Sequence, residues 1–438
     1  MTRIALFLLL VLASPAAMAQ QWAAVWTGSA QGPYPIGNPT AQPELKFAFP
    51  SPEKGANDQT FRLIVKPDAW GQQVRIRLSN TFGTKPVTFD NAFVGLQESG
   101  SAVVPGTSRP LQFQSKKSVT VAPGESIVSD PVALPFVRPG DAMHDQLLRG
   151  RKLAISFHVA GESGPMTWHA KALQTSYVSP PGGGAKGPDE ADGAFPFSTA
   201  SWYFLDEVDL LMAKPAKVIV AFGDSITDGT GTTINGDDRW PDVLSRRVHA
   251  AYGDGFVVVN QGIGGNQVAG PDDYAAKPIP GGPGALSRLE RDIVRLPAVA
   301  SVIWLEGIND FGAADATAET VIEAYKKGVA YLRQKIPGVK IYGATLTSAL
   351  HSTPTHGRPE VDAKRKALND FIRNGKLFDG VVDFDGPTFD SATGEVKAMY
   401  QPNSSVGGPG DKLHPNRAGY ATMADAIDLG MITGQPKK

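Results

Sequence analysis

The chain has 438 residues, of which 42% are hydrophobic and 19% charged, enough apolar residues for more than one core. Its 42 basic and 43 acidic residues nearly cancel, and no basic patch is present, which argues against a nucleic-acid-binding protein. It contains no cysteine, which excludes disulfides, thiolate metal sites and a cysteine nucleophile.

Residues 1–19 have the pattern of a secretory signal peptide. Arg3 supplies a positive charge, residues 4–12 are continuously apolar, and residues 17–19 (Ala-Met-Ala) form a small-x-small cleavage motif. The apolar run is too short to span a bilayer as a stable helix, so an uncleaved anchor is the weaker alternative. We therefore predict export to the periplasm or the exterior, with no membrane span after cleavage.

Residues 20–214 have the pattern of a β-rich domain. Apolar side chains alternate with arginine and serine along residues 74–79, as in a half-buried strand. We expect strands at 61–66, 74–78, 87–96, 111–113, 118–121, 153–159 and 202–212. Frequent turn residues between them favour an antiparallel β-sandwich. Residues 180–193, rich in Gly and Pro, are predicted to form a flexible, exposed loop.

From about residue 215 the pattern changes to apolar strands that alternate with helices. We expect strands at 217–222, 256–260, 300–305, 340–344 and 381–384, and helices at 240–252, 286–296, 318–335, 360–374 and 417–428. This alternation predicts an α/β domain, residues 215–438, with a parallel sheet covered on both faces. Its active groups should lie in loops at the carboxyl ends of the strands.

Four polar or Gly-rich segments fall where such a sheet builds a site. They are Gly-Asp-Ser-Ile-Thr (223–227), Asn-Gln-Gly-Ile-Gly-Gly-Asn (260–266), Gly-Ile-Asn-Asp (307–310) and Asp-Lys-Leu-His-Pro-Asn (411–416). Alone, a serine at a strand end is more often a turn or cap residue, and Thr227 departs from the Gly-x-Ser-x-Gly elbow. The order of all four segments is far more specific than any one of them.

Together these segments resemble the signature blocks of the SGNH (GDSL-type) hydrolase superfamily. The resemblance covers about half of the chain and implies a flavodoxin-like domain with a five-stranded parallel sheet. It implies Ser225 as the nucleophile, His414 as its base and Asp411 as the acid that orients the base. It also implies an oxyanion hole formed by the backbone amides of Ser225 and Gly265 and the side chain of Asn309.

These assignments agree with the chemistry of ester hydrolysis. A serine hydroxyl is a poor nucleophile until a neighbouring base accepts its proton, and a carboxylate fixes the tautomer of that base. Attack on the ester carbonyl creates an oxyanion that needs hydrogen-bond donors. We expect no cofactor and no metal.

Other conspicuous residues have plainer interpretations. His249 is expected on the surface or in packing, and the spacing of His351 and His356 suits no standard zinc motif. Trp240 is expected to be a buried anchor rather than a wall of the cleft. The Gly-rich segment 262–267 lacks the final glycine of a dinucleotide-binding fingerprint, so nucleotide binding is not expected.

The leading hypothesis is a secreted esterase that removes short acyl groups, chiefly O-acetyl groups, from polysaccharides. The β-rich half resembles the accessory region of some secreted SGNH carbohydrate esterases. It either lends His169 or Tyr177 to the rim of the cleft or consists of ordinary sandwich residues. The alternatives are an arylesterase, lysophospholipase or thioesterase with the same triad, or a glycan-binding protein with an inactive hydrolase domain. The oligomeric state is left open.

Overall fold

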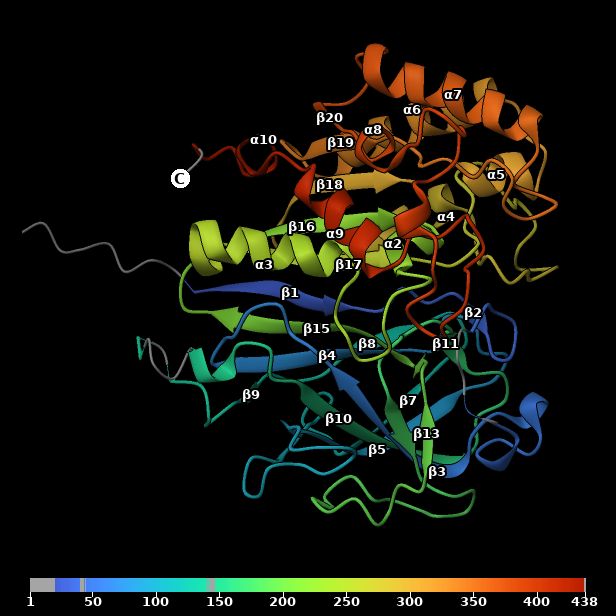
Figure 1. Cartoon of the computed structure of the whole chain (residues 1–438). Coiled ribbons are helices and arrows are strands. Elements are labelled where there is room, and N and C mark those ends of the chain that lie inside the picture. Colours follow the sequence, from blue (N-terminus) through green and yellow to red (C-terminus); the bar gives the residue numbers. More distant parts are fainter. Residues whose placement is uncertain (1–19, 40–42, 44, 139, 142–145, 437–438) are drawn as a thin grey trace, which may run out of the picture.

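The computed structural model describes residues 20–436 except 40–42, 44, 139 and 142–145 (Figure 1). The predicted signal peptide, residues 1–19, lies outside the described residues. The β-rich part precedes the α/β part in the chain, and Figure 1 shows the two stacked against each other.

The β-rich part contains two main antiparallel sheets and a small third one. The inner sheet consists of β1 (Gln21–Thr27), β15 (Leu205–Met212), β4 (Gln73–Ser79), β8 (Ser126–Val128) and β9 (Val132–Ala133). The outer sheet consists of β13 (Phe197–Thr199), β12 (Ser176–Val178), β3 (Asn57–Val65), β10 (Leu153–Glu162), β5 (Val87–Leu96), β6 (Arg109–Pro110) and β7 (Ser118–Val121). The small sheet consists of β14 (Trp202–Tyr203), β11 (Thr167–His169) and β2 (Gly32–Pro33). Two short 3-10 turns, η1 (Leu45–Phe47) and η2 (Pro52–Lys54), precede β3.

Two expectations for this part need correction. Residues 111–113 form no strand, because only Phe113 makes an isolated bridge, to Lys116. The expected strand 202–212 is interrupted at Phe204, whose φ of 59° breaks the extended backbone between β14 and β15. In the loop 180–193, residues 188–189 and 191–193 are exposed, as expected, while the buried Arg62 donates to the carbonyl oxygens of Gly187 and Asp189.

The polar face of β4 is covered rather than exposed. Arg77 is buried and pairs with Asp206 at 2.7 Å and with Glu207, both of which lie on the neighbouring strand β15. Arg75 pairs with Asp209 at 2.8 Å in the same way. This inner sheet lies between the outer sheet and the α/β part (Figure 1). The charged side chains of β4 are therefore paired with carboxylates of the neighbouring strand β15 instead of being hydrated by water.

The α/β part is built on a parallel five-stranded sheet. Its strands are β16 (Lys217–Gly223), β17 (Phe256–Gly262), β18 (Val299–Leu305), β19 (Lys340–Ala344) and β20 (Gly380–Val382). Their spatial order, β17-β16-β18-β19-β20, is the flavodoxin-like order, so the predicted fold class is confirmed. The strand order reverses at β16, which makes the end of that strand a topological switch point.

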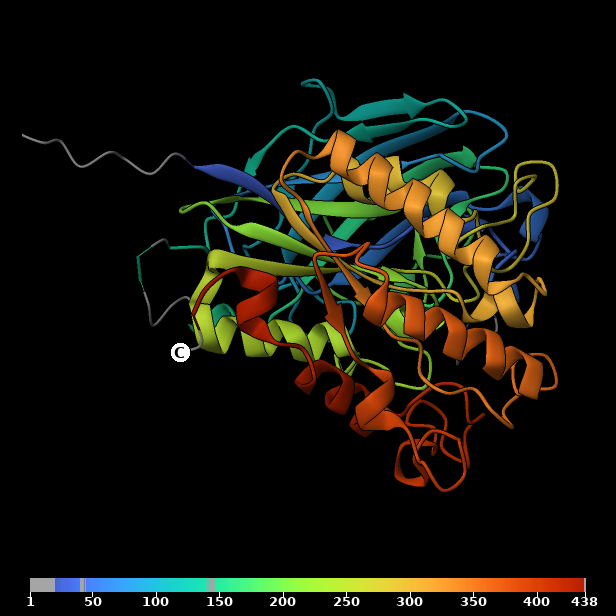
Figure 2. The ribbon, with the colours of Figure 1, turned by 90° about the horizontal axis from the view of Figure 1, so that it is seen from above.

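Helices cover both faces of this sheet. They are α2 (Ser225–Asp228), α3 (Trp240–Tyr252), η3 (Gly253–Gly255), α4 (Ala285–Leu289), η4 (Glu290–Val294), α5 (Ile308–Gly312), α6 (Ala318–Lys335), α7 (Pro359–Asn374), α8 (Asp385–Thr388), η5 (Ala398–Tyr400), α9 (Arg417–Asp425) and α10 (Leu429–Thr433). Figure 2 shows α6 on the side of the sheet opposite to α3 and α9. Along β16, Val220 packs with the α6 side and Ile219 packs with the α3 side, as the alternation of a strand requires.

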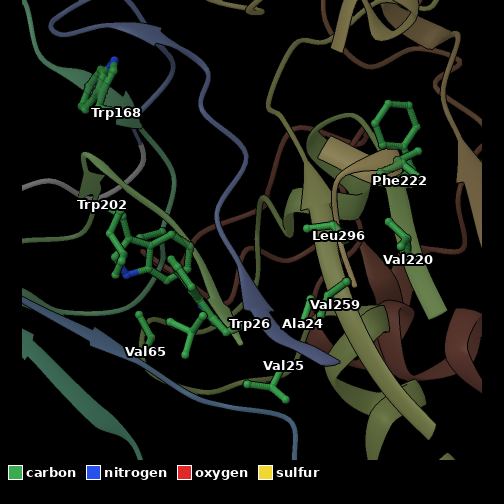
Figure 3. Packing of buried hydrophobic residues seen from close by; sticks show 14 of the residues in the cluster. Ala24, Val25, Trp26, Val65, Trp168, Trp202, Val220, Phe222, Val259 and Leu296 are labelled. Carbon is green, nitrogen blue, oxygen red and sulfur yellow. The ribbon is translucent and has the colours of Figure 1, made fainter. Parts of the chain in front are cut away.

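The two parts share one hydrophobic core. The cluster that contains Val220 and Val259 of the parallel sheet continues without a break to Trp26 and Trp202 in the β-rich part. Figure 3 shows β1 as the link, with Ala24 near Val259 and with Trp26 against Trp202, whose ring centroids are 4.8 Å apart. The β-rich part is therefore packed into the α/β part along β1.

Among the described residues, no helix combines the length and the apolar character needed to cross a membrane.

Candidate active site

Ser225 lies at the switch point of the parallel sheet. It is the first residue of α2, two residues after the end of β16, and it is 6% exposed. Gly223 allows the neighbouring strand β18 to lie close, because a Cβ there would lie 2.1 Å from the carbonyl oxygen of Leu305. The side chain of Asp224 caps α2 by accepting from the Ile226 amide at 2.9 Å. The Ser225 amide, at the start of this helix, has no acceptor among the described residues.

The structure brings the three residues of the predicted triad into a hydrogen-bonded chain. Ser225 Oγ is 2.8 Å from His414 Nε2, and His414 Nδ1 is 2.5 Å from Asp411 Oδ2. The second carboxylate oxygen of Asp411 accepts from the amides of Leu413 and His414, both at 2.9 Å. Because Nδ1 donates to a carboxylate, Nε2 is left to accept the serine proton.

Asp411 is held in its ionised form. Burial by itself would raise the pKa of Asp411, but hydrogen bonds and charge from His414, together with the two backbone amides, hold that pKa well below its usual range. The carboxylate is thus available to orient His414 and to balance a positive charge on its ring.

The loop after β17 carries the predicted backbone donor, Gly265. Its φ of 85° lies in the left-handed region, and a Cβ there would lie 2.9 Å from Asn38 Nδ2 and 3.1 Å from Gly281 Cα. The Gly265 amide has no acceptor among the described residues. It is thus a second backbone donor that is free to bind an anion.

Asn309, the third predicted donor, lies at the start of α5. One of its two Nδ2 hydrogens is used, since Nδ2 donates to the carbonyl oxygen of Asn266 at 2.9 Å. Its Oδ1 lies 3.1 Å from Nε2 of His356. One N–H of the side-chain amide is left for another acceptor. The contact with Asn266 places Asn309 beside Gly265, the neighbour of Asn266 in the chain.

Buried charged groups hold the Gly265 loop from beneath. Asp310 accepts from the amides of Val268 and Ala269, both at 2.9 Å, and burial raises the pKa of Asp310 to about 6. Arg288 is also buried and donates to Asn266 Oδ1 at 2.8 Å and to the carbonyl oxygen of Gly223 at 3.0 Å. Arg288 therefore ties the turn before Ser225 to the loop that carries Gly265.

The β-rich part reaches the site from its other side. His169 is buried and lies 3.1 Å from Asp228 Oδ1 on α2, while Asp228 Oδ2 accepts from the Gly264 amide at 2.9 Å. Lys171 is also buried and donates to Thr230, just after α2; burial lowers the pKa of Lys171, although nearby carboxylates oppose that effect. Side chains from the β-rich part therefore hold both α2 and the Gly265 loop.

The two candidate residues of the β-rich part thus have different positions. His169 lies beneath the site, in contact with Asp228, rather than on the rim of the cleft. Tyr177, on β12, packs against a separate small cluster of Ile64, Val103 and Ala154. Of these two residues, His169 is the one that contacts α2, the helix that carries Ser225.

The remaining conspicuous residues also have definite positions. Trp240 is fully buried, as expected. His249, expected on the surface or in packing, instead forms ion pairs with Asp68 and Asp254. His351 pairs with Glu395 at the surface. Within the part of the chain that the structure describes, no three His, Asp or Glu side chains converge as a metal-binding group.

Sequence reasoning missed three supporting residues. The position of Asp228 could have been recognised in the sequence, since it follows Ser225 by three residues and therefore lies on the same helical turn. Arg288 has no such signal, because an arginine within an amphipathic segment usually faces water. His356 has none either, because its contact with Asn309 spans 47 residues of sequence.

Residues 221–422 match the model of the GDSL-like Lipase/Acylhydrolase family. Solved structures similar to the chain include a carbohydrate acetylesterase family member from Sinorhizobium meliloti (18% identity, 50% of this chain and 100% of that one, TM-score 0.37). They also include an aryl esterase from M. smegmatis (17% identity, 48% of this chain and 96% of that one, TM-score 0.37). A third is a GDSL-like lipase from Bacteroides thetaiotaomicron (16% identity, 50% of this chain and 89% of that one, TM-score 0.36). A comparison with curated proteins finds no match.

Proposed function

We propose that this chain, whose residues 221–422 form a GDSL-like lipase/acylhydrolase domain, is an exported serine esterase that removes short acyl groups, above all O-acetyl groups, from polysaccharides. The family match supports a carboxylic ester hydrolase. The hydrogen-bonded chain from Ser225 through His414 to Asp411 is the observation that carries the proposal.

In the proposed reaction, Ser225 Oγ bonds to the ester carbonyl carbon while its proton passes to His414 Nε2. The carbonyl oxygen becomes an oxyanion, which accepts from the amides of Ser225 and Gly265 and from Asn309 Nδ2. Collapse breaks the bond to the alkoxy oxygen, which leaves with the proton from His414 and gives an acyl-enzyme. A water molecule then gives its proton to His414 and attacks the acyl carbon, which releases the acid and restores the Ser225 hydroxyl.

Polar groups around the triad support a hydroxylated substrate. Asn38 is exposed and lies against Gly265, with its Nδ2 3.3 Å from the carbonyl oxygen of Gly264. The Asp411 side chain is partly exposed at the edge of the site. Hydrogen-bonding groups at these positions suit a sugar chain better than a long acyl chain, which needs an apolar wall. The predicted signal peptide supports export, where such polymers are found.

The test is hydrolysis by the purified mature chain. We expect rapid turnover of p-nitrophenyl acetate, slow turnover of the octanoate ester, and acetate release from acetylated xylan. Ser225→Ala should abolish all three activities, whereas Ser118→Ala, an exposed serine of β7 in the outer sheet, should retain them.

The alternatives predict other outcomes. Preference for long-chain or aryl esters without acetate release from xylan would replace the carbohydrate substrate by that of a lysophospholipase, thioesterase or arylesterase. Activity that survives in Ser225→Ala would refute the proposed mechanism. No hydrolysis together with polysaccharide binding would favour the binding protein.

A further inference from the structure

His356 lies next to the site, on a loop that the proposed reaction does not use. The loop connects β19 to α7, and the imidazole packs on the backbone of α5, where a Cβ at Gly312 would lie 2.3 Å from His356 Cδ2. Its Nε2 lies 3.1 Å from Asn309 Oδ1. His356 therefore contacts the only side chain among the three proposed oxyanion donors.

The contacts of Asn309 fix which end of its amide faces which neighbour. The carbonyl oxygen of Asn266, 2.9 Å away, can only accept, so it must face the Nδ2 end of Asn309. The Oδ1 end then faces His356, and Nε2 of that ring must carry a proton to donate to it. In the opposite orientation, Oδ1 would face the Asn266 carbonyl oxygen, acceptor against acceptor, and both N–H groups would lie on the His356 side instead of beside Gly265.

The surroundings of His356 favour the required tautomer. Its Nδ1 lies 3.0 Å from Thr353 Oγ1 and 2.9 Å from Thr355 Oγ1, so a threonine hydroxyl can donate to it. Burial, together with the charge of His414, lowers the pKa of His356, which favours the neutral ring. A neutral ring that accepts at Nδ1 carries its single proton on Nε2, where Asn309 needs it.

We propose that His356 is a positioning residue that holds the side-chain amide of Asn309 with its free N–H directed at the oxyanion. This role rests on the proposed esterase function. The oxyanion exists only after attack has begun. A misoriented Asn309 therefore stabilises the transition state less, while the binding of the unreacted ester is unchanged. Loss of His356 should therefore lower kcat and leave KM nearly unchanged.

The experiment compares His356→Leu, His356→Gln and Asn309→Ala in p-nitrophenyl acetate hydrolysis. We expect His356→Leu to lower kcat about tenfold to a hundredfold, less than the ~10²–10³ typical for removal of a donor itself. The Gln variant, whose side chain still has an N–H, should recover much of that loss. His351→Ala is the matched control, since it lies on the same loop and pairs with Glu395 instead of Asn309.

The double variant His356→Leu/Asn309→Ala separates positioning from general structural damage. If His356 acts through Asn309, adding His356→Leu to Asn309→Ala should change kcat by no more than about twofold. An equal loss of kcat in both backgrounds, or an unchanged kcat in His356→Leu, would overturn the positioning role while Ser225-dependent turnover still stood. Wild-type turnover that does not depend on Ser225 would instead overturn the esterase proposal and this role with it.

Discussion

His249 joins the α/β part of the molecule to the β-rich part. It lies on α3, and its Nε2 is 3.0 Å from Asp68 Oδ2, in the segment that follows β3. Its Nδ1 is 3.3 Å from Asp254 Oδ1. Asp68 also accepts from the Val258 amide at 2.7 Å, so one carboxylate contacts both α3 and β17. Replacement of His249 by Asn should weaken this junction.

The size of the effect follows from the pKa of His249. Burial lowers this pKa, but hydrogen bonds and charge from Asp254 and Asp68 outweigh burial and raise the pKa from its ordinary 6.5 to about 10. At about 1.4 kcal/mol for each factor of ten in proton affinity, the upper limit of the stabilisation is about 5 kcal/mol. Because the Asp254 side chain is 48% exposed, water and salt screen its share, and we expect about 2 kcal/mol.

The direction of the pKa shift of His249 determines the pH range in which this residue stabilises the fold. The folded-state pKa lies above the unfolded value, so the stabilisation is complete below about pH 6.5 and is lost as pH rises toward about 10. Urea unfolding, followed by tryptophan fluorescence, should therefore show His249→Asn about 2 kcal/mol less stable than wild type near pH 6. The difference should shrink by about pH 9.5.

The control is His351→Asn, because His351 pairs with a single carboxylate and its side chain is 58% exposed. We expect its unfolding free energy to stay within about 0.5 kcal/mol of wild type. A difference between His249→Asn and wild type that is the same at every pH would refute the ionic origin of the stabilisation. No difference at any pH would refute the role of His249 at the junction.

Three further substitutions probe the site. Asp411→Asn should leave the base in the wrong tautomer and lower kcat by about 10⁴, measured as p-nitrophenyl acetate turnover; a loss below tenfold would contradict its orienting role. Gly265→Ala strains a backbone with φ of 85° and should lower kcat more than it raises KM; unchanged steady-state kinetics would show that the site does not need a glycine at position 265. His169→Leu breaks the contact with Asp228 and should lower both the unfolding free energy, by about 2 kcal/mol, and kcat, so intact turnover would limit His169 to stability.

The sequence predicts the α/β part well, because its signals are local. Each apolar strand and each amphipathic helix depends on residues a few positions apart, and the parallel order follows from their alternation. The hydrogen bonds among Ser225, His414 and Asp411 lie where the four motifs predict them, at the carboxyl end of the sheet. Their catalytic roles stay predictions until they are measured.

Contacts between residues far apart in the sequence were beyond local patterns. The alternation along β4 predicts one solvent-exposed face. Arg77 on that face is instead buried against Asp206 and Glu207, because the α/β part covers the inner sheet. His249 and Asp68 are 181 residues apart in the sequence. Periodicity shows that a residue is buried or exposed in its own element, but it does not identify the distant residue that contacts it.

The domain boundary predicted between residues 214 and 215 stays a prediction. The change from short strands to alternating strands and helices marks it in the sequence, and no element of the structure crosses it, since β15 ends at Met212 and β16 begins at Lys217. The shared core along β1 and the contact between His169 and Asp228 could not be foreseen from composition. The β-rich part therefore supports the site directly, whether or not it also binds substrate.

The most direct test of the account is covalent trapping of the nucleophile with a fluorophosphonate, followed by peptide mass spectrometry and turnover of p-nitrophenyl acetate. An activated serine reacts with such a reagent, whereas an ordinary serine hydroxyl does not. We predict a single modified residue, Ser225, and a loss of turnover in proportion to its labelling, with no labelling in Ser225→Ala or His414→Ala. Labelling at another residue, or full turnover after complete labelling of Ser225, would contradict the account.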